Sequence, residues 1–216
     1  MIVTIDGHSG AGKSSVAILV ANKLGFKVLY SGLIYRAFAS LVYEYVQIDN
    51  LNDDLISSIV RENLDFLKQA GRGELESERF RSFGDLASKL SACSAVRNAL
   101  LSVQRTCYLN LSFVAEGRDM GTVVFPEAEY KFFIDCSLSV KLKRFLKFNE
   151  NCEDYGLIAK HDLCIPTAIE ILERDLRDSL RAVAPTRKSR EAFFILNDDE
   201  IDKTVDEICR ICRGAI

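Results

Sequence analysis

The segment from Gly7 to Ser14, GHSGAGKS, has the residue types and spacing of a phosphate-binding loop. It matches G-x-x-x-x-G-K-[ST], follows a short β-branched run and opens a helical pattern, which is the context the motif requires. Its glycines let backbone N–H groups converge on a phosphate, the helix N-terminus and Lys13 add positive charge, and the Ser14 hydroxyl suits Mg²⁺. The loop predicts a nucleoside triphosphate site. We expect its binding residues to be Gly7, His8, Ser9, Gly10, Ala11, Gly12, Lys13, Ser14 and Ser15.

Arginines follow two of the predicted strands. Arg36 lies one turn into a helix after the second strand, and Arg118 follows the third strand between Gly117 and Gly121. The carboxyl edge of an α/β sheet is where such proteins bind ligands, and a guanidinium matches phosphate oxygens with a planar fork of donors. These positions indicate a second anion pocket, as required when the acceptor is itself a phosphate. An ionised phosphate oxygen needs no general base, but cations must close over the group and exclude water.

The segment ERDLRDSLRAVAP, residues 173–185, places Arg174, Arg177 and Arg181 on one helical face. Alone, this spacing is typical of a solvated helix with surface ion pairs, because the arginines alternate with aspartates. Beside a phosphate loop and two further arginines it predicts a lid, with the aspartates holding the arginines while it is open. Pro185 should mark its end. Whether Arg177 faces ATP or solvent stays open.

Short apolar runs alternate with helical patterns, which predicts one α/β domain with a parallel sheet covered on both faces. The predicted strands are 2–6, 26–30, 111–115, 130–134 and 192–196. The predicted helices are 13–24, 33–45, 85–108 with a break near 91–94, 138–148, 167–180 and 201–211, and Asp53 and Asp54 can begin a short helix. We expect a core over about 1–46, 85–149 and 186–216, an insert over 47–84 and a lid region over 150–185. The alternation in ELESERFRSF predicts that residues 62–84 are partly β.

The composition excludes several classes of protein. A net charge of −3 over 216 residues provides no basic face for duplex nucleic acid. No apolar run is long enough to cross a bilayer and no targeting segment is evident, so we expect a cytoplasmic monomer that acts on small molecules. The seven cysteines are scattered, and the CxxC pair Cys209 and Cys212 lies in a helical pattern that predicts reduced, half-buried thiols. The guanine-reading N-K-x-D and a DxxG switch are missing, which disfavours a GTPase.

Five segments occur in the order and approximate spacing of the bacterial cytidylate kinase family, which the chain resembles over nearly its whole length. They are TIDGHSGAGKSS, YSGLIYRAF, EGRDMGTVVFPEA, IDCSLSVKLKRF and ERDLRDSLRAVAP. The resemblance implies a phosphate-loop kinase fold with five parallel strands, a CMP-binding insert and a short lid. It implies in-line transfer of the γ-phosphoryl group of Mg·ATP to CMP or dCMP.

The resemblance also implies roles for individual residues. It puts Ser31, Arg36 and Arg118 around the acceptor CMP, with Ser88, Arg97 and Asp119 on the cytosine. It puts Arg174 and Asp178 near the ribose and phosphate, and Arg181 in a lid over the phosphates. Arg144 matches a further cation on the transferring group, so Lys13, Arg144, Arg174 and Arg181 are the expected catalytic residues.

The chain departs from the family pattern at three places, and two alternative functions stay open. Tyr30 stands where the family usually has Asp, His8 where Pro is common, and the insert is shortened around 62–84. Another small-molecule kinase, with UMP, AMP or a metabolite as acceptor, is the first alternative. A nucleotide-dependent switch is the second. The first gives no reason for Ser88, Arg97 and Asp119 together, since a carboxylate, a hydroxyl and an arginine complement cytosine. The missing guanine and switch motifs disfavour the second.

Overall fold

A computed structural model describes residues 1–45, 51–149 and 157–214, so the predicted starts of the insert and of the lid region lie partly outside the described residues. The five predicted strands form one parallel sheet in the order β2-β3-β1-β4-β5. Their bounds are β1 Ile2–Gly7, β2 Lys27–Tyr30, β3 Phe113–Gly117, β4 Tyr130–Asp135 and β5 Phe193–Leu196. The order places the carboxyl ends of β1 and β3 side by side at the ligand-binding edge of the sheet.

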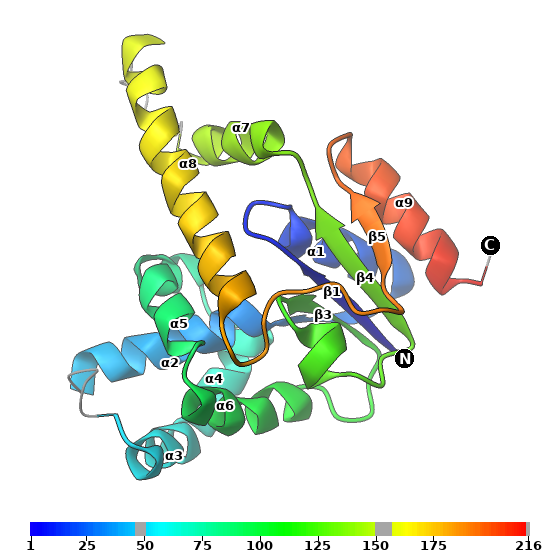
Figure 1. Ribbon diagram of the computed structural model, residues 1–216. Helices are drawn as coiled ribbons and strands as arrows, with labels where there is room; N and C mark the ends of the chain where they lie inside the picture. Colours follow the sequence, from blue (N-terminus) through cyan, green and yellow to red (C-terminus); the bar gives the residue numbers. More distant parts are fainter. Residues whose placement is uncertain (46–50, 150–156, 215–216) are drawn as a thin grey trace.

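Helices cover both faces of this sheet, as parallel crossovers require (Figure 1). On one face lie α1 Lys13–Leu24 and α9 Ile201–Cys212. On the other gather α2 Ser31–Tyr45, α3 Asp53–Glu62, α4 Leu64–Gly71, α5 Gly84–Leu90 and α6 Ser94–Thr106, with the short turns η2 Ser77–Phe83 and η3 Met120–Val124. The long α8 Leu157–Leu180 runs past the phosphate loop to α5, and α7 Leu138–Asn149 lies beside it (Figure 1).

Two hydrophobic cores follow from the two-residue period of the strands. In β3, Phe113 and Ala115 belong to the core under α2, whereas Val114 belongs to the core under α1 and α9. Phe38 of α2 and Ile208 of α9 are fully buried in their respective cores. The sheet is therefore held rigidly between two layers, and its carboxyl edge offers a fixed base for a site.

The insert differs from its prediction. Residues 62–84 were expected to be partly β, and they form α4 and the 3₁₀ turn η2. Phe80 and Phe83 are three residues apart, which is the period of a 3₁₀ helix, and Phe80 is buried in the core under α2. The alternation of charges in ELESERFRSF thus reflects a solvated helical face. The predicted break near 91–94 is confirmed, because α5 ends at Leu90 and α6 begins at Ser94.

The helix that carries the arginine stripe also differs in its bounds. It begins at Leu157 and ends at Leu180, so Pro185 does not set its end. Residues after Leu180 turn back sharply: Ala184 has a positive φ of 49°, and the Thr186 N–H donates to the Asp178 carbonyl at 2.8 Å. This turn fixes where Arg181 points. In α9, Cys209 and Cys212 are free thiols and are buried, more deeply than predicted.

Candidate active site

The phosphate loop has the backbone conformation that its glycines predict. Gly10 and Gly12 have φ of 73° and 86°, in the left-handed region. Gly7 has φ 148°, and a Cβ there would lie 1.8 Å from the Ile134 carbonyl oxygen. No side chain caps the N-terminus of α1, so its first N–H groups are left for an anion.

Lys13 is buried at the start of α1, and its Nζ donates to the His8 carbonyl at 2.6 Å. Burial, reinforced by the nearby Arg118 guanidinium, lowers the pKa of Lys13 to about 7. A buried ammonium among other cations is costly unless an anion joins it. The loop is therefore poised for a ligand with several negative charges.

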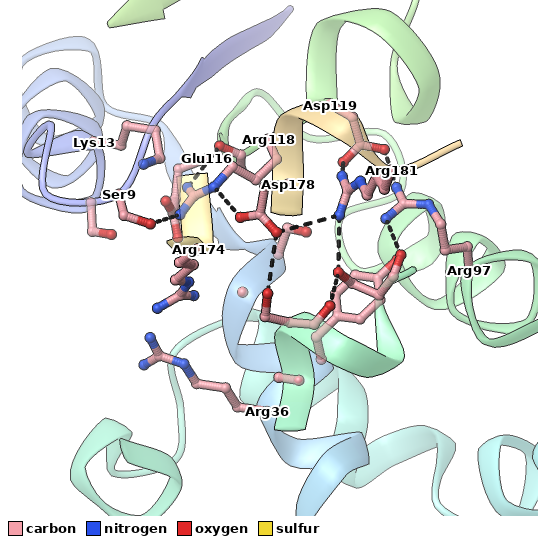
Figure 2. A pocket seen from close by; sticks show the side chains of 18 of the residues that line it. Ser9, Lys13, Arg36, Arg97, Glu116, Arg118, Asp119, Arg174, Asp178 and Arg181 are labelled. Atoms are coloured by element: carbon pink, nitrogen blue, oxygen red, sulfur yellow. Dashed lines mark hydrogen bonds and ion pairs between the residues drawn. The ribbon is translucent and has the colours of Figure 1, made fainter. Parts of the chain in front are cut away.

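Two cavities flank this loop. The first cavity has more polar residues in its lining than the second. It lies between the phosphate loop, α2, α5, the end of β3 and α8 (Figure 2). It brings together every residue expected to contact the acceptor: Ser31, Arg36, Ser88, Arg97, Arg118, Asp119, Arg174 and Asp178. The second cavity is lined by Gly10, Gly12, Lys13, Ser14, Ser15, Arg144, Asn197 and Ile201. Lys13 and Ser14 line both cavities, so their side chains can contact a ligand in either one.

One end of the first cavity is strongly cationic. Arg36 from α2 and Arg174 from α8 point toward each other across the space below Lys13 (Figure 2). Arg174 Nε is buried without a hydrogen-bond partner, and burial, with the repulsion of Arg118, lowers the pKa of Arg174 to about 10. Burial also lowers the pKa of Arg36. A buried donor without a partner among like charges is the arrangement that an anionic ligand completes.

The other end of the cavity is built around Asp119. Arg97, itself buried, forms an ion pair with Asp119, and its guanidinium stacks near the Tyr35 ring, 5.7 Å from the centroid. Arg181 Nη2 lies 3.7 Å from the Asp119 carboxylate, and Arg181 Nη1 donates to Ser91 Oγ at 2.9 Å. This end therefore offers a carboxylate with two guanidinium groups in a buried setting, which suits a planar ligand with both donors and acceptors.

Arg181 lies in a different place from the one that the resemblance implied. Arg181 was expected over the phosphates, and the structure places it beside Asp119, at the end of the cavity away from Lys13 (Figure 2). The cause is the turn that follows Leu180, because Arg181 Nε donates to the Ala184 carbonyl at 2.6 Å. The open question about Arg177 is also answered. It pairs with Asp85 at 2.9 Å and reaches Ser88 Oγ at 3.3 Å, so it joins α8 to α5.

Arg118 connects the two ends of the cavity. Its Nε donates to Asp178 at 3.1 Å, and its Nη2 donates to Ser9 Oγ at 2.9 Å. Ser88 Oγ donates to the other oxygen of Asp178 at 3.2 Å. The aspartate thus holds Arg118 in place, whereas the prediction had the aspartates of the stripe holding the stripe's own arginines.

Several residues of the cavity were missed by the sequence analysis. Gln104 donates to Ser31 Oγ at 2.7 Å, and Tyr35, Ser91 and Glu116 line the cavity. Gln104 and Ser91 lie outside the five segments that resemble the family, whereas Tyr35 lies in YSGLIYRAF and Glu116 in EGRDMGTVVFPEA without having been given a role. The available signal was position, since Tyr35 precedes Arg36 and Glu116 lies two residues before Arg118, near the end of β3.

A chain of polar contacts ties the phosphate loop to α7 and α8. Asp175 accepts the Ser9 N–H at 2.7 Å and Lys141 Nζ at 3.1 Å, and Lys141 also reaches Asp135 at 3.0 Å. His8 Nδ1 lies 2.9 Å from Asp135. Burial opposes ionisation there, but the hydrogen bonds from His8 and Lys141 hold the pKa of Asp135 well below its usual range. The loop and the arginine-bearing helix are therefore mechanically connected.

Arg144 of α7 lines the second cavity. Its Nη2 donates to the Asn197 carbonyl at 2.7 Å, and its Nη1 is buried without a hydrogen-bond partner. Asn197 Nδ2 in turn donates to the Ala11 carbonyl of the loop at 2.9 Å.

Within the described ranges, no group of three or more His, Cys, Asp or Glu side chains could hold a metal ion, and no helix is long and apolar enough to cross a membrane.

The sheet order, the glycine-rich loop between β1 and α1 and a second cationic cavity facing that loop define a phosphate-loop kinase of small molecules. The cytidylate kinase family profile matches residues 3–214. Cytidylate kinase of Vibrio cholerae serotype O1 is 39% identical, with 96% of this chain and 92% of the relative covered. Cytidylate kinase of Methylococcus capsulatus is 37% identical, with 100% and 96% covered. The chain belongs to the cytidylate kinase family.

Similarity to solved structures is weaker. A shikimate kinase from Bacteroides thetaiotaomicron aligns with 99% of this chain and 98% of its own at 13% identity, with a TM-score of 0.42. The fold assignment rests on the strand order β2-β3-β1-β4-β5.

Proposed function

We propose that this chain transfers the γ-phosphoryl group of ATP to CMP or dCMP, giving ADP and CDP or dCDP. The observation that carries the proposal is the first cavity: cations at the end next to the phosphate loop, and a buried carboxylate–guanidinium cluster at the other end. A nucleoside monophosphate has the same polarity, with a dianionic phosphate at one end and a hydrogen-bonding base at the other. Family membership supports the same acceptor.

At the phosphate end, Arg36, Arg118 and Arg174 hold the acceptor phosphate in line with the donor. No general base is required, because an ionised phosphate oxygen is already a nucleophile. Lys13 faces the triphosphate, whose negative charge raises the pKa of the ammonium and keeps it protonated at neutral pH. Arg144 supplies a further cation from the second cavity. Positioning and charge stabilisation by these residues lower the barrier of a loose phosphoryl-transfer transition state.

At the base end, Asp119 accepts a hydrogen bond from the exocyclic amine of cytosine, and Arg97 and Ser88 donate to its O2 and N3. Uracil would set its O4 against the Asp119 carboxylate, leaving two acceptors facing each other. Arg181 stabilises the ionised carboxylate from the other side. Discrimination through an unmatched buried polar group is the strong kind of selectivity.

Mg²⁺ is proposed to arrive with ATP. The Ser14 hydroxyl and the Glu116 carboxylate line the same cavity, and oxygen ligands of this kind suit Mg²⁺. When bound, the ion would neutralise charge on the β- and γ-phosphates. The insert (about 47–84) and the lid region (about 150–185) are proposed to move over the acceptor and the donor, respectively.

An acceptor panel tests the proposal. ADP release from ATP is measured with CMP, dCMP, UMP, AMP and shikimate in parallel, with and without EDTA. We expect turnover with CMP and dCMP at least tenfold above the others, and loss of turnover in EDTA. Strong turnover with AMP but not CMP would overturn the proposed acceptor.

Size-exclusion chromatography tests the proposed monomer, and a small-molecule enzyme of net charge −3 is expected to show no retention by nucleic acid or vesicles.

A further inference from the structure

Asp6 has an arrangement that neither the motif nor the cavity explains. It is the residue of β1 immediately before the phosphate loop, it is 4% exposed, and it does not line either cavity at the loop. Its two carboxylate oxygens accept backbone N–H groups from across the sheet edge: Met120 at 2.7 Å and Gly121 at 2.8 Å. Two short N–H···O hydrogen bonds to the two oxygens of one carboxyl group form an oriented contact. Burial raises the pKa of Asp6 to about 7, and the two N–H donors oppose that rise.

The segment that Asp6 holds is the one that presents the acceptor contacts. Met120 and Gly121 directly follow Arg118 and Asp119 in the chain. In the ladder between β1 and β3, Asp6 is paired with Gly117, the last residue of β3. The side chain of Asp6 therefore continues the connection between the two strands, just where the backbone ladder ends and the chain turns away.

The turn itself has little freedom to shift. The Asp119 carbonyl accepts the Val123 N–H at 2.9 Å and the Val124 N–H at 3.2 Å, which closes η3. Gly121 is pressed against β1, because a Cβ there would lie 2.7 Å from Thr4 Oγ1. A turn that is closed on itself, packed on β1 and bonded to Asp6 can project Arg118 and Asp119 in one direction only.

We propose that Asp6 is a positioning residue for the acceptor: its carboxylate fixes the turn after β3, so that Arg118 faces the acceptor phosphate and Asp119 faces the base. The naming of the acceptor rests on the proposed function. Gly7, the next residue, begins the phosphate loop, so one side chain sets the distance between the donor loop and the acceptor-reading turn. Asp6 does not touch substrate in this assignment and acts only through the turn.

Asp6→Asn tests the assignment with almost no change in volume. The amide oxygen can accept one N–H, but the amide nitrogen must then face the other N–H, which loses its partner. We expect KM for CMP to rise about tenfold or more and the CMP:UMP ratio of kcat/KM to fall at least fivefold. KM for ATP should stay within twofold. Intact mass is measured throughout, because Asn-Gly pairs deamidate back to Asp.

Val205→Ala is the matched control. Val205 is fully buried in α9 against α1 and β1, so its truncation lowers stability without contacting the turn or the acceptor cavity. At equal folded fraction it should leave KM for CMP and the CMP:UMP ratio unchanged. If Val205→Ala reproduces the effects of Asp6→Asn, or if Asp6→Asn leaves KM for CMP within twofold, the assignment is wrong.

The result of the Asp6→Asn experiment can be distinguished from the result of the acceptor panel. If the wild-type chain prefers another monophosphate, the proposed function fails, and the same comparison with the preferred acceptor still tests Asp6. If Asp6→Asn does not fold, Asp6→Glu and amide exchange of the wild type decide. The Met120 and Gly121 amides should then exchange as slowly as ladder amides of β1 and β3, and exchange at loop rates would overturn the assignment.

Discussion

Replacement of Asp119 by Asn is the sharpest test of how the base is recognised. Asp119 is 3% exposed and lies between Arg97 and Arg181, whose side chains are 7% and 5% exposed. The substitution keeps the shape of the side chain and removes its charge. It also turns a pure acceptor into a group that can donate to the O4 of uracil.

The magnitude follows from this burial. A hydrogen bond to a charged group contributes about 1.5–3 kcal/mol, so loss of the charged acceptor should lower kcat/KM for CMP roughly 10- to 150-fold. For UMP the new donor offsets part of this loss, so the CMP:UMP ratio should fall at least tenfold. Removing the carboxylate also leaves two buried guanidinium groups short of a partner. Because Asp178 lies 4.0 Å from Arg181 and supplies some compensation, we expect a loss of stability below the 3–5 kcal/mol typical of a broken buried pair.

The assay is ADP release coupled to NADH oxidation, with CMP and UMP varied at saturating ATP, and thermal unfolding measured beside it. Asp206→Asn is the matched control, because Asp206 pairs with Lys23 on the exposed surface of α9 and should change neither measurement. The reasoning fails if Asp119→Asn keeps kcat/KM for CMP within twofold of wild type, or if UMP loses as much as CMP.

Three further predictions address the loop and α8. Lys13→Met should abolish turnover and raise the melting temperature of the nucleotide-free protein. The folded-state pKa of Lys13, about 7, lies below the ordinary value of 10.5. The stability of the wild-type protein should therefore fall as the pH drops from 10.5 to 7 and then level off. The gain in melting temperature should therefore be larger at pH 7 than at pH 10, and equal gains would contradict the assigned pKa. Gly7→Ala should destabilise the fold by about 3 kcal/mol or more in urea unfolding, since its Cβ would lie 1.8 Å from the Ile134 carbonyl; a loss under 1 kcal/mol would refute the close approach. Arg181→Ala should raise KM for CMP more than it lowers kcat, because Arg181 lies beside Asp119. An effect on kcat alone, in the same kinetic assay, would show that Arg181 acts on the phosphates instead.

Much of the fold was predictable because its signals are local. Helix α1 was predicted with its observed bounds, since a glycine-rich loop precedes it and Gly25 ends it in the left-handed conformation. The five strands were found from short apolar runs. The insert was mistaken because alternating charges imitate the period of a strand, and only the burial of Phe80 shows which period applies.

The sequence by itself determined the chemistry of the donor loop and the neighbourhood of Arg118 and Asp119. Both depend on residues close in the chain, at the carboxyl ends of strands whose order the crossovers restrict. It also determined which residues would share the acceptor cavity, through the resemblance to a family.

Only the tertiary structure decided what each of those residues contacts. Arg177 contacts Asp85, 92 residues away in the chain, and Arg181 contacts Ser91, 90 residues away. Both contacts form because α8 packs against α5. Asp6 reaches Met120 and Gly121 because β1 and β3 lie side by side in the sheet. The direction of a side chain depends on how its element is docked and where that element ends, and those quantities are set by packing between distant segments rather than by local pattern.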